Sequence, residues 1–166
     1  MPVRKEVNLK KRQIQSVDRQ REVKANASVV CYERTLNHGK LGKFQQSTIY
    51  TKRKGNFCGS IIINNAAGDI RAQVNFGLRK TKKYGKEIEL TSLLVNPERR
   101  QEGFFEQILA EASSIGKKRG ADAITLEVKK HKKIAREVYR RMGFVEVKEE
   151  RKQASGPPRV RMRLAL

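Results

Sequence analysis

A turn that opens a helix is the part of this sequence best suited to binding a phosphate group. An apolar strand pattern ends at Leu94-Val95, and the basic stretch 99–103 follows before a helical pattern starts at Phe104. The first amides of a helix have no partner in the helix backbone, and the aligned peptide dipoles make that end positive. A glycine-containing basic turn at this place therefore predicts a site for a pyrophosphate.

The same stretch resembles motif A of the GNAT acyltransferase family, in which a strand ending V-x-P is followed by R/Q-x-x-G-x-G/A. Arg100 and Gly103 stand at the matching positions. The resemblance implies that backbone amides of this turn wrap the pyrophosphate of acetyl-coenzyme A, or of another acyl-CoA, as co-substrate. Phe105 stands where the family usually has Gly or Ala, so its ring must either turn into the core or crowd the phosphates. The residues implied as cofactor contacts here are Arg100, Gln101, Glu102, Gly103, Phe104 and Phe105.

A second match lies around the helical pattern that follows Lys132. Leu126-x-Val128, Ala135, Tyr139 and Gly143-Phe144 follow the family's motif B, L-x-V-x-x-x-N-x-x-A-x-x-x-Y-x-x-x-G-F, with Lys132 in place of the Asn. Family members use this tyrosine to protonate the departing thiolate, which implies a catalytic role for Tyr139. A phenol with a pKa near about 10 suits that task. Spacing alone favours a core aromatic at Tyr139, and Lys132 is a candidate phosphate contact.

Acyl transfer to an amine also needs a base, because a lysine-type amine has a pKa near about 10.4 and must lose its proton to attack. Family members often place a glutamate on the strand before motif A, and Glu87 and Glu89 are the candidates. They share one side of a two-residue repeat, and the alternative is that both are solvent-facing charges. An extended pantetheine would pair with the free strand edge near Leu93 and Val95.

Hydrophobic periodicity predicts the elements that position these residues. The runs 57–63 and 70–78 are β-prone and joined by a turn, which predicts a hairpin. Apolar residues recur at three- and four-residue spacing from Phe104 to Ile115, which predicts an amphipathic helix ended by Gly120. The other predicted elements are strands at 29–32, 88–95, 123–128, 144–147 and 160–166, basic and polar loops at 37–42 and 80–86, and a helix over 134–142 with its apolar stripe at Ile134, Ala135, Val138, Tyr139 and Met142.

The order of these elements predicts an α/β fold with helices packed on a sheet. The resemblance implies the GNAT arrangement: a mixed, mostly antiparallel sheet with helices on both faces, splayed between the strands 88–95 and 123–128. It covers the chain from about residue 87 onward. The family's usual first two helices are not recognisable in the first half of the sequence.

Charge divides the chain into a tail and a domain. Residues 1–25 are strongly basic with few apolar residues, which predicts a tail, either without structure or with a short helix over 7–23, before a single domain at 26–166. Lys and Arg total 38 against 17 acidic residues, a net charge of +21. Such a field attracts polyanions, nucleic acid among them. Aromatic residues make up only 6% of the chain, which favours phosphate contacts over base stacking.

The remaining chemistry-bearing residue types give no further site. Cys31 and Cys58 have no C-x-x-C spacing and no secretory segment precedes them, which predicts a reducing intracellular, for example cytoplasmic, setting. His38 and His131 are isolated, so no metal is expected. No apolar run approaches the roughly 20 residues of a membrane span, so no membrane partner is expected.

Two functions are compatible with the sequence. The first is an acyl-CoA-dependent N-acyltransferase, in the simplest case for acetyl transfer to an amine, whose substrate lies in a nucleic-acid complex; the positive charge disfavours a cationic peptide as acceptor. The second is a catalytically degenerate protein of the same fold, acting as a structural or nucleic-acid-associated part of a nucleoprotein assembly or virion. Phe105 and Lys132 favour the second function, because both depart from the family pattern.

Overall fold

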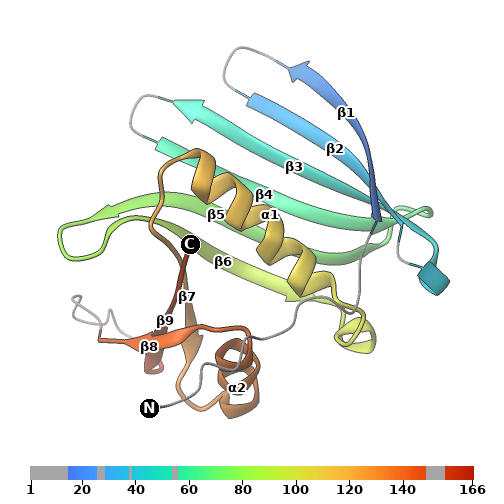
Figure 1. Cartoon of the computed structure of the whole chain (residues 1–166). Coiled ribbons are helices and arrows are strands. Elements are labelled where there is room, and N and C mark those ends of the chain that lie inside the picture. Colours follow the sequence, from blue (N-terminus) through green and yellow to red (C-terminus); the bar gives the residue numbers. More distant parts are fainter. Residues whose placement is uncertain (1–14, 26–28, 38, 54–55, 149–155) are drawn as a thin grey trace, which may run out of the picture.

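The computed structural model describes residues 15–25, 29–37, 39–53, 56–148 and 156–166. They form one sheet of nine strands in the order β1-β2-β3-β4-β5-β6-β7-β9-β8, with two α-helices (Figure 1). The strands are β1 Gln15–Ala25, β2 Val29–Asn37, β3 Lys43–Arg53, β4 Asn56–Asn65, β5 Ile70–Thr81, β6 Gly85–Val95, β7 Ala123–Lys129, β8 Val145–Val147 and β9 Arg159–Ala165. The helices are α1 Phe104–Lys118 and α2 Lys133–Arg141, with 3-10 turns η2 Gly39–Leu41 and η3 Pro97–Arg99.

The strands β1 to β6 form a meander in which every neighbouring pair is antiparallel. The predicted hairpin is confirmed as β4 and β5. Its turn is closed by Asn65, whose side chain donates to the Asp69 carboxylate at 2.9 Å and accepts from the Asp69 amide at 2.7 Å. Alternate residues of both strands, Ile61, Ile63, Ala72 and Val74, have no exposed surface, because period-two side chains share one face of a sheet.

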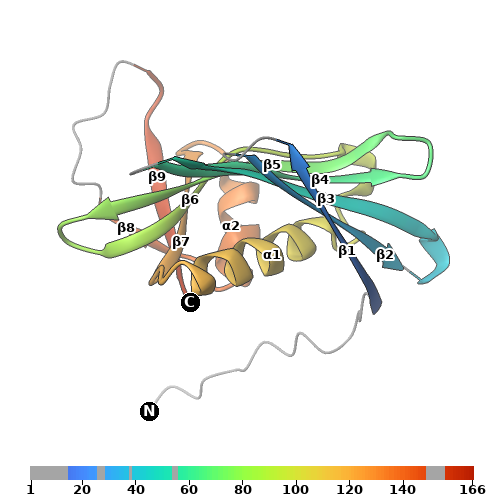
Figure 2. The same cartoon turned by 90° about the horizontal axis from the view of Figure 1, so that it is seen from above.

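Helix α1 covers that buried face across β4 to β7, and Figure 2 shows it lying along the sheet. Its buried residues, Phe104, Ile108, Ala112 and Ile115, recur at the predicted spacing. The helix ends as expected: the Arg119 amide reaches the carbonyls of Ile115 and Gly116, and Gly120 has a φ of +65°. The predicted amphipathic helix is therefore confirmed.

Helix α2 packs on the same face as α1. Ile88 of β6, Ile124 of β7 and Leu164 of β9 are register partners, so their side chains share one face of the sheet. On that face Ile88 lies against Gly116 of α1, and Leu164 approaches Gly143, just after α2. The predicted mixed, mostly antiparallel fold is confirmed, but both described helices lie on one face instead of two. Within α2, Ala135, Tyr139 and Met142 pack against the core, whereas Ile134 is 84% and Val138 is 41% exposed.

The chain before α1 differs from the sequence-based expectation. Residues 15–25 form the edge strand β1, paired with β2, and not a tail or a helix; the rest of the predicted tail and helix, residues 1–14, lies outside the described residues. Nothing described before α1 is an α-helix, so strands stand where the family's first two helices were sought. The predicted loop 80–86 is shorter, because β5 extends to Thr81 and β6 begins at Gly85.

Candidate functional site

The sheet is open between β6 and β7. These two strands are the parallel pair, and their pairing runs only from Glu87 to Leu90 on β6 and from Ala123 to Leu126 on β7. Past that point β6 is irregular: Ser92 has a φ of +52°, and the β5–β6 register shifts beside it. A bulge bends a strand and changes its direction. The predicted splay between these strands is confirmed, and it leaves backbone edges of both strands without a strand partner.

The turn that follows β6 leads directly into the start of α1. The Asn96 side chain accepts from the Glu98 amide at 3.1 Å, and the Arg99 amide donates to the Asn96 carbonyl at 2.9 Å, which fixes η3. Gly103 then takes a left-handed conformation, with φ +83°, as the N-cap of α1, and no side chain caps the helix there. Since helix N-termini leave amides outside the helical ladder, this turn offers main-chain donors at the positive end of the dipole.

The predicted contact residues of the turn lie before Gly103, at Arg100 to Glu102, and after it, at Phe104 and Phe105. Arg100 and Gln101 are exposed, and Glu102 is held by Arg99 at 2.9 Å. Arg100 forms no ion pair within the described part of the chain. The Glu102 carboxylate is thus paired with Arg99, while Arg100 remains available to an anion.

Both phenylalanines at the start of α1 turn their rings away from the turn. Phe104 is 1% exposed and its ring centroid lies 5.0 Å from that of Phe44 on β3. Phe105 is 7% exposed and its ring lies 5.6 Å from that of Tyr139 on α2. Of the two orientations open to Phe105 from the sequence, the structure has the inward one, so its ring does not crowd the anion position.

Tyr139 lies between Phe105 and Phe144, whose ring is 5.9 Å away. Burial raises the pKa of its hydroxyl above the ordinary value near 10, because the charged phenolate is poorly solvated in an apolar setting. The hydroxyl has no hydrogen-bond partner among the residues described. It is therefore a protonated group, without a competing acceptor, next to the start of α1.

Glu87 and Glu89 share a face of β6, as predicted, but have different surroundings. Glu87 has no exposed surface, and its two carboxylate oxygens accept from Arg161 at 2.6 Å and from Arg163 at 3.0 Å. The Glu89 side chain is 28% exposed and pairs with Arg79 at 3.0 Å. Glu89 is therefore accessible to solvent, whereas Glu87 is enclosed and ties β6 to β9.

The other predicted contacts lie around the opening. Leu93 and Val95 are half-buried on the part of β6 that continues beside β5 but no longer pairs with β7. Lys132 is exposed and is the N-cap of α2, where its carbonyl accepts from the Arg136 amide at 3.1 Å. The structure thus brings together the turn, the open edge of β6 and Tyr139, and it separates Glu87 from them.

Two contributors were missed from the sequence. Ser92 shapes the opening, and its signal was the polar pair Thr91-Ser92, which breaks the alternation of polar and apolar residues in β6. Arg79, the partner of Glu89, lies ten residues away in the sequence and had no local signal, since cross-strand pairing depends on register.

The described residues contain no group of three or more His, Cys, Asp or Glu side chains able to hold a metal ion. None of their helices is long and apolar enough to cross a membrane.

Comparison with known proteins agrees with this geometry. Residues 22–144 match the model of the acetyltransferase (GNAT) family. No curated protein sequence matches the chain.

Similar solved structures include an acetyltransferase of the GNAT family from Staphylococcus aureus Mu50, at 18% identity and a TM-score of 0.52 over 65% of this chain and 67% of that one. The NatC complex bound to Gag peptide and CoA is similar at 18% identity and a TM-score of 0.54, over 64% and 70%. An acetyltransferase from Streptococcus agalactiae 2603 is similar at 12% identity and a TM-score of 0.53, over 66% and 67%. At these identities the likeness concerns the fold.

Proposed function

The chain belongs to the acetyltransferase (GNAT) family, and from this premise we propose that it transfers an acyl group, in the simplest case acetyl, from acyl-coenzyme A to an amine. The observation that carries the proposal is the open wedge between β6 and β7, which begins just past Leu90 and adjoins the uncapped start of α1 at Gly103. Tyr139 lies beside that helix start. One extended ligand with a diphosphate fits these three features.

The proposed contacts with acyl-CoA follow from the hydrogen-bond donors and cations around the opening. The diphosphate of acyl-CoA would lie at the Gly103 turn, where main-chain amides and Arg100 supply donors and positive charge. Lys132, exposed at the start of α2, would add a second cation. The pantetheine amides would pair with the β6 edge near Leu93 and Val95, since an unpaired strand edge offers backbone donors and acceptors.

The chemistry needs one proton donated and one removed. A neutral amine nitrogen attacks the thioester carbonyl, a C–N bond forms, the C–S bond breaks, and the sulfur leaves as a thiolate. Tyr139, kept protonated by burial, gives its hydroxyl proton to that sulfur and is reprotonated from solvent. The proton of the amine passes to Glu89, directly or through water. Glu87 has no part in this step, because it is enclosed by Arg161 and Arg163.

The proposal is tested by titrating the full chain with acetyl-CoA in a calorimeter and by measuring free-thiol release with a panel of amines. We expect saturable binding and amine-dependent thiol release. Absence of both heat and turnover at millimolar acetyl-CoA would remove the proposal.

Replacing Tyr139 by Phe isolates the role of the hydroxyl. The variant keeps the ring contacts with Phe105 and Phe144, so acetyl-CoA affinity and stability should change little. We expect kcat to fall by about 10²–10⁴-fold, the usual contribution of a general acid. Tyr84→Phe is the matched control, because Tyr84 lies in the turn between β5 and β6. Equal rates for the two variants would assign Tyr139 to the core alone.

A second candidate function is that of a nucleic-acid-associated component of a larger assembly, with or without acyl transfer. Four exposed lysines around the start of α2 form no ion pair within the described ranges, and the whole chain carries a charge of +21. They are Lys129, Lys130, Lys132 and Lys133. Polyanion binding by phosphate contacts weakens steeply with salt.

Filter binding of DNA and RNA across a salt series tests this second function. A steep negative slope of log affinity against log salt supports it, and a slope reduced by Lys130→Gln with Lys133→Gln would locate the contact. Absent or salt-independent binding argues against it.

A further inference from the structure

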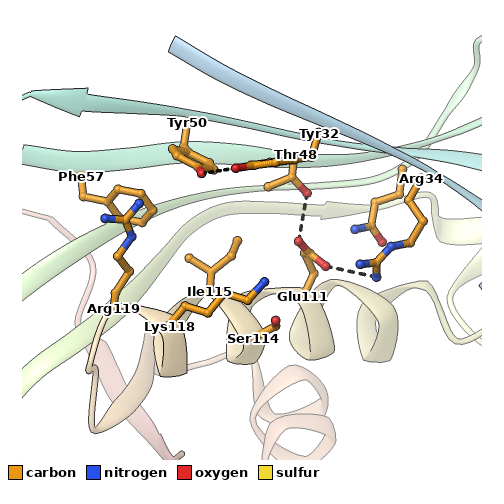
Figure 3. A pocket seen from close by; sticks show the side chains of 11 residues that line it. Tyr32, Arg34, Thr48, Tyr50, Phe57, Glu111, Ser114, Ile115, Lys118 and Arg119 are labelled. Atoms are coloured by element: carbon orange, nitrogen blue, oxygen red, sulfur yellow. Dashed lines mark hydrogen bonds and ion pairs between the residues drawn. The ribbon is translucent and has the colours of Figure 1, made fainter. Parts of the chain in front are cut away.

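A cavity of about 310 Å³ lies at the other end of α1, away from the Gly103 turn (Figure 3). Its helix side comes from the last two turns of α1, from Glu111 to Lys118, and from Arg119, which directly follows the helix; its sheet side comes from β2, β3 and β4. The helix side of the lining begins at Glu111, which lies about 12 Å along the helix from Gly103 at 1.5 Å per residue, and none of the residues assigned to acyl-CoA lines the cavity. The cavity is thus separate from the site proposed for acyl-CoA.

The floor of the cavity is polar where a packed core is expected to be apolar. Gln46 and Thr48 of β3 face the helix and are each 2% exposed, while Ile49, the residue after Thr48, points to the other face and is 37% exposed. Gln46 accepts from Gln107 at 2.9 Å, and Thr48 donates to Glu111 at 3.4 Å. Polar groups cost free energy to bury, and such departures from core patterning concentrate at functional sites.

Two cations at this cavity have no carboxylate partner in the described part of the chain. The Arg119 guanidinium lies 4.2 Å from the ring centroid of Phe57 and 5.8 Å from that of Tyr50, so aromatic stacking, not an ion pair, orients it. Lys118 is exposed at the rim. Arg34, the third cation, pairs with Glu111 at 3.4 Å. Among the residues that line the cavity, three cations accompany one carboxylate, a charge of +2 for the lining.

A hydroxyl donor completes the lining. The Tyr50 hydroxyl donates to the Tyr32 hydroxyl at 2.9 Å, which leaves the proton of Tyr32 to be donated elsewhere. In Figure 3 this pair lies on the sheet side, across the cavity from Ser114 and Lys118 on the helix. Cations, a hydroxyl donor and a buried polar floor are the groups that recognise an anion.

We propose that this cavity is a second ligand site, which takes a compact organic dianion such as a phosphate monoester. The volume is at the low end of the roughly 300–1,000 Å³ of small-molecule sites, so the ligand is small. The negative end of the α1 dipole opposes an anion here with about half a charge, and the two unpaired cations exceed it. The site takes a different ligand from acyl-CoA, and its test does not depend on acyl transfer.

The test is calorimetry of the full chain with phenyl phosphate and with inorganic phosphate, at constant ionic strength. We expect saturable binding of phenyl phosphate that Arg119→Gln and Lys118→Gln each weaken by about tenfold, the effect of about 1.4 kcal/mol. Lys117→Gln is the matched control, since Lys117 is an exposed neighbour with the same charge that does not line the cavity. Arg100→Gln, at the other end of α1, should also leave binding unchanged.

A variant that should strengthen binding distinguishes a local effect from loss of the folded structure. Glu111→Gln removes the one negative group of the cavity, so it should tighten phenyl phosphate binding, which damage to the structure would not do. The proposal is overturned if phenyl phosphate does not bind at millimolar concentration, if Lys117→Gln weakens binding as much as Arg119→Gln, or if Glu111→Gln weakens it.

Discussion

The two ends of α1 offer an anion different kinds of groups. At the N-terminal end, Gly103 leads the chain into the helix with main-chain amides uncapped by side chains, and β6 and β7 are apart. At the C-terminal end those strands are paired, and the cations Lys118 and Arg119 lie over a polar sheet face. The first end uses backbone and dipole, and the second must use side chains because the dipole there has the wrong sign.

This difference teaches that one helix can serve two sites only if they depend on separate groups. The N-terminal site depends on local backbone geometry and on a gap in the sheet. The C-terminal cavity depends on strands 60 to 80 residues earlier, as the contacts Thr48–Glu111 and Arg34–Glu111 show with separations of 63 and 77 residues.

The largest expected effect on stability comes from removing the buried carboxylate of Glu87, at the end of the sheet where β6 and β7 are paired. Glu87→Ala leaves Arg161, 8% exposed at its side chain, and Arg163 without their shared carboxylate between β6 and β9. Removing one partner of a buried ion pair costs about 3–5 kcal/mol. We expect the free energy of unfolding, measured by urea titration, to fall by that amount.

Glu89→Ala is the control for this variant, two residues along the same face. Its pair with Arg79 is partly exposed, so the cost should be below about 1 kcal/mol, while amine-dependent turnover falls. Similar stabilities for the two variants would contradict the distinction drawn between the two glutamates.

Two glycine variants, with an effect of intermediate size on stability, should distinguish the two ends of α1. Gly103 and Gly120 both have positive φ, +83° and +65°, and alanine in that conformation costs about 1–2 kcal/mol. We expect Gly103→Ala and Gly120→Ala to lower thermal stability alike. Only Gly103→Ala should weaken acetyl-CoA binding in calorimetry, because only that turn supplies the amides.

A small effect should appear at high pH at the C-terminal end. Burial, followed by the hydrogen bond with Tyr32, raises the pKa of Tyr50 from 10.0 to about 12. Between these values the folded chain keeps a proton that the unfolded chain loses, so this contribution to stability is present below pH 10 and is lost as pH rises toward 12. Between pH 9 and pH 11 the free energy of unfolding should therefore fall less for Tyr50→Phe than for the parent chain.

The measurement is the urea midpoint of both proteins at the two pH values. Parallel losses would show that the Tyr50 proton is not held more tightly in the folded chain.

Local pattern predicted the elements of this fold well. The β4–β5 hairpin, α1 with its buried stripe, and the return strand β9 depend on period and turn residues within short windows. Strands β1 and β3 were missed. The stretch 15–25 has no clear alternation, and the inward face of β3 includes the polar residues Gln46 and Thr48, so the strand form of both depends on pairing with neighbouring strands.

The candidate site was predictable to the extent that it is contiguous. The Gly103 turn and the neighbourhood of Tyr139 could be found because each lies within one motif. The Phe105 orientation, the enclosure of Glu87 by two arginines and the pairing of Glu89 with Arg79 could not, since each depends on side chains from other elements.

The sequence by itself determined the secondary structure from β4 onward, the sign of the charge and a glycine-led helix start, because these depend on neighbours a few residues apart. Only the tertiary structure decided which glutamate is reachable, that both helices share a face, and that polar residues of β3 meet cations of α1 around a cavity. The physical reason is that burial and ion pairing depend on strand register and helix placement, which bring together residues far apart in the chain.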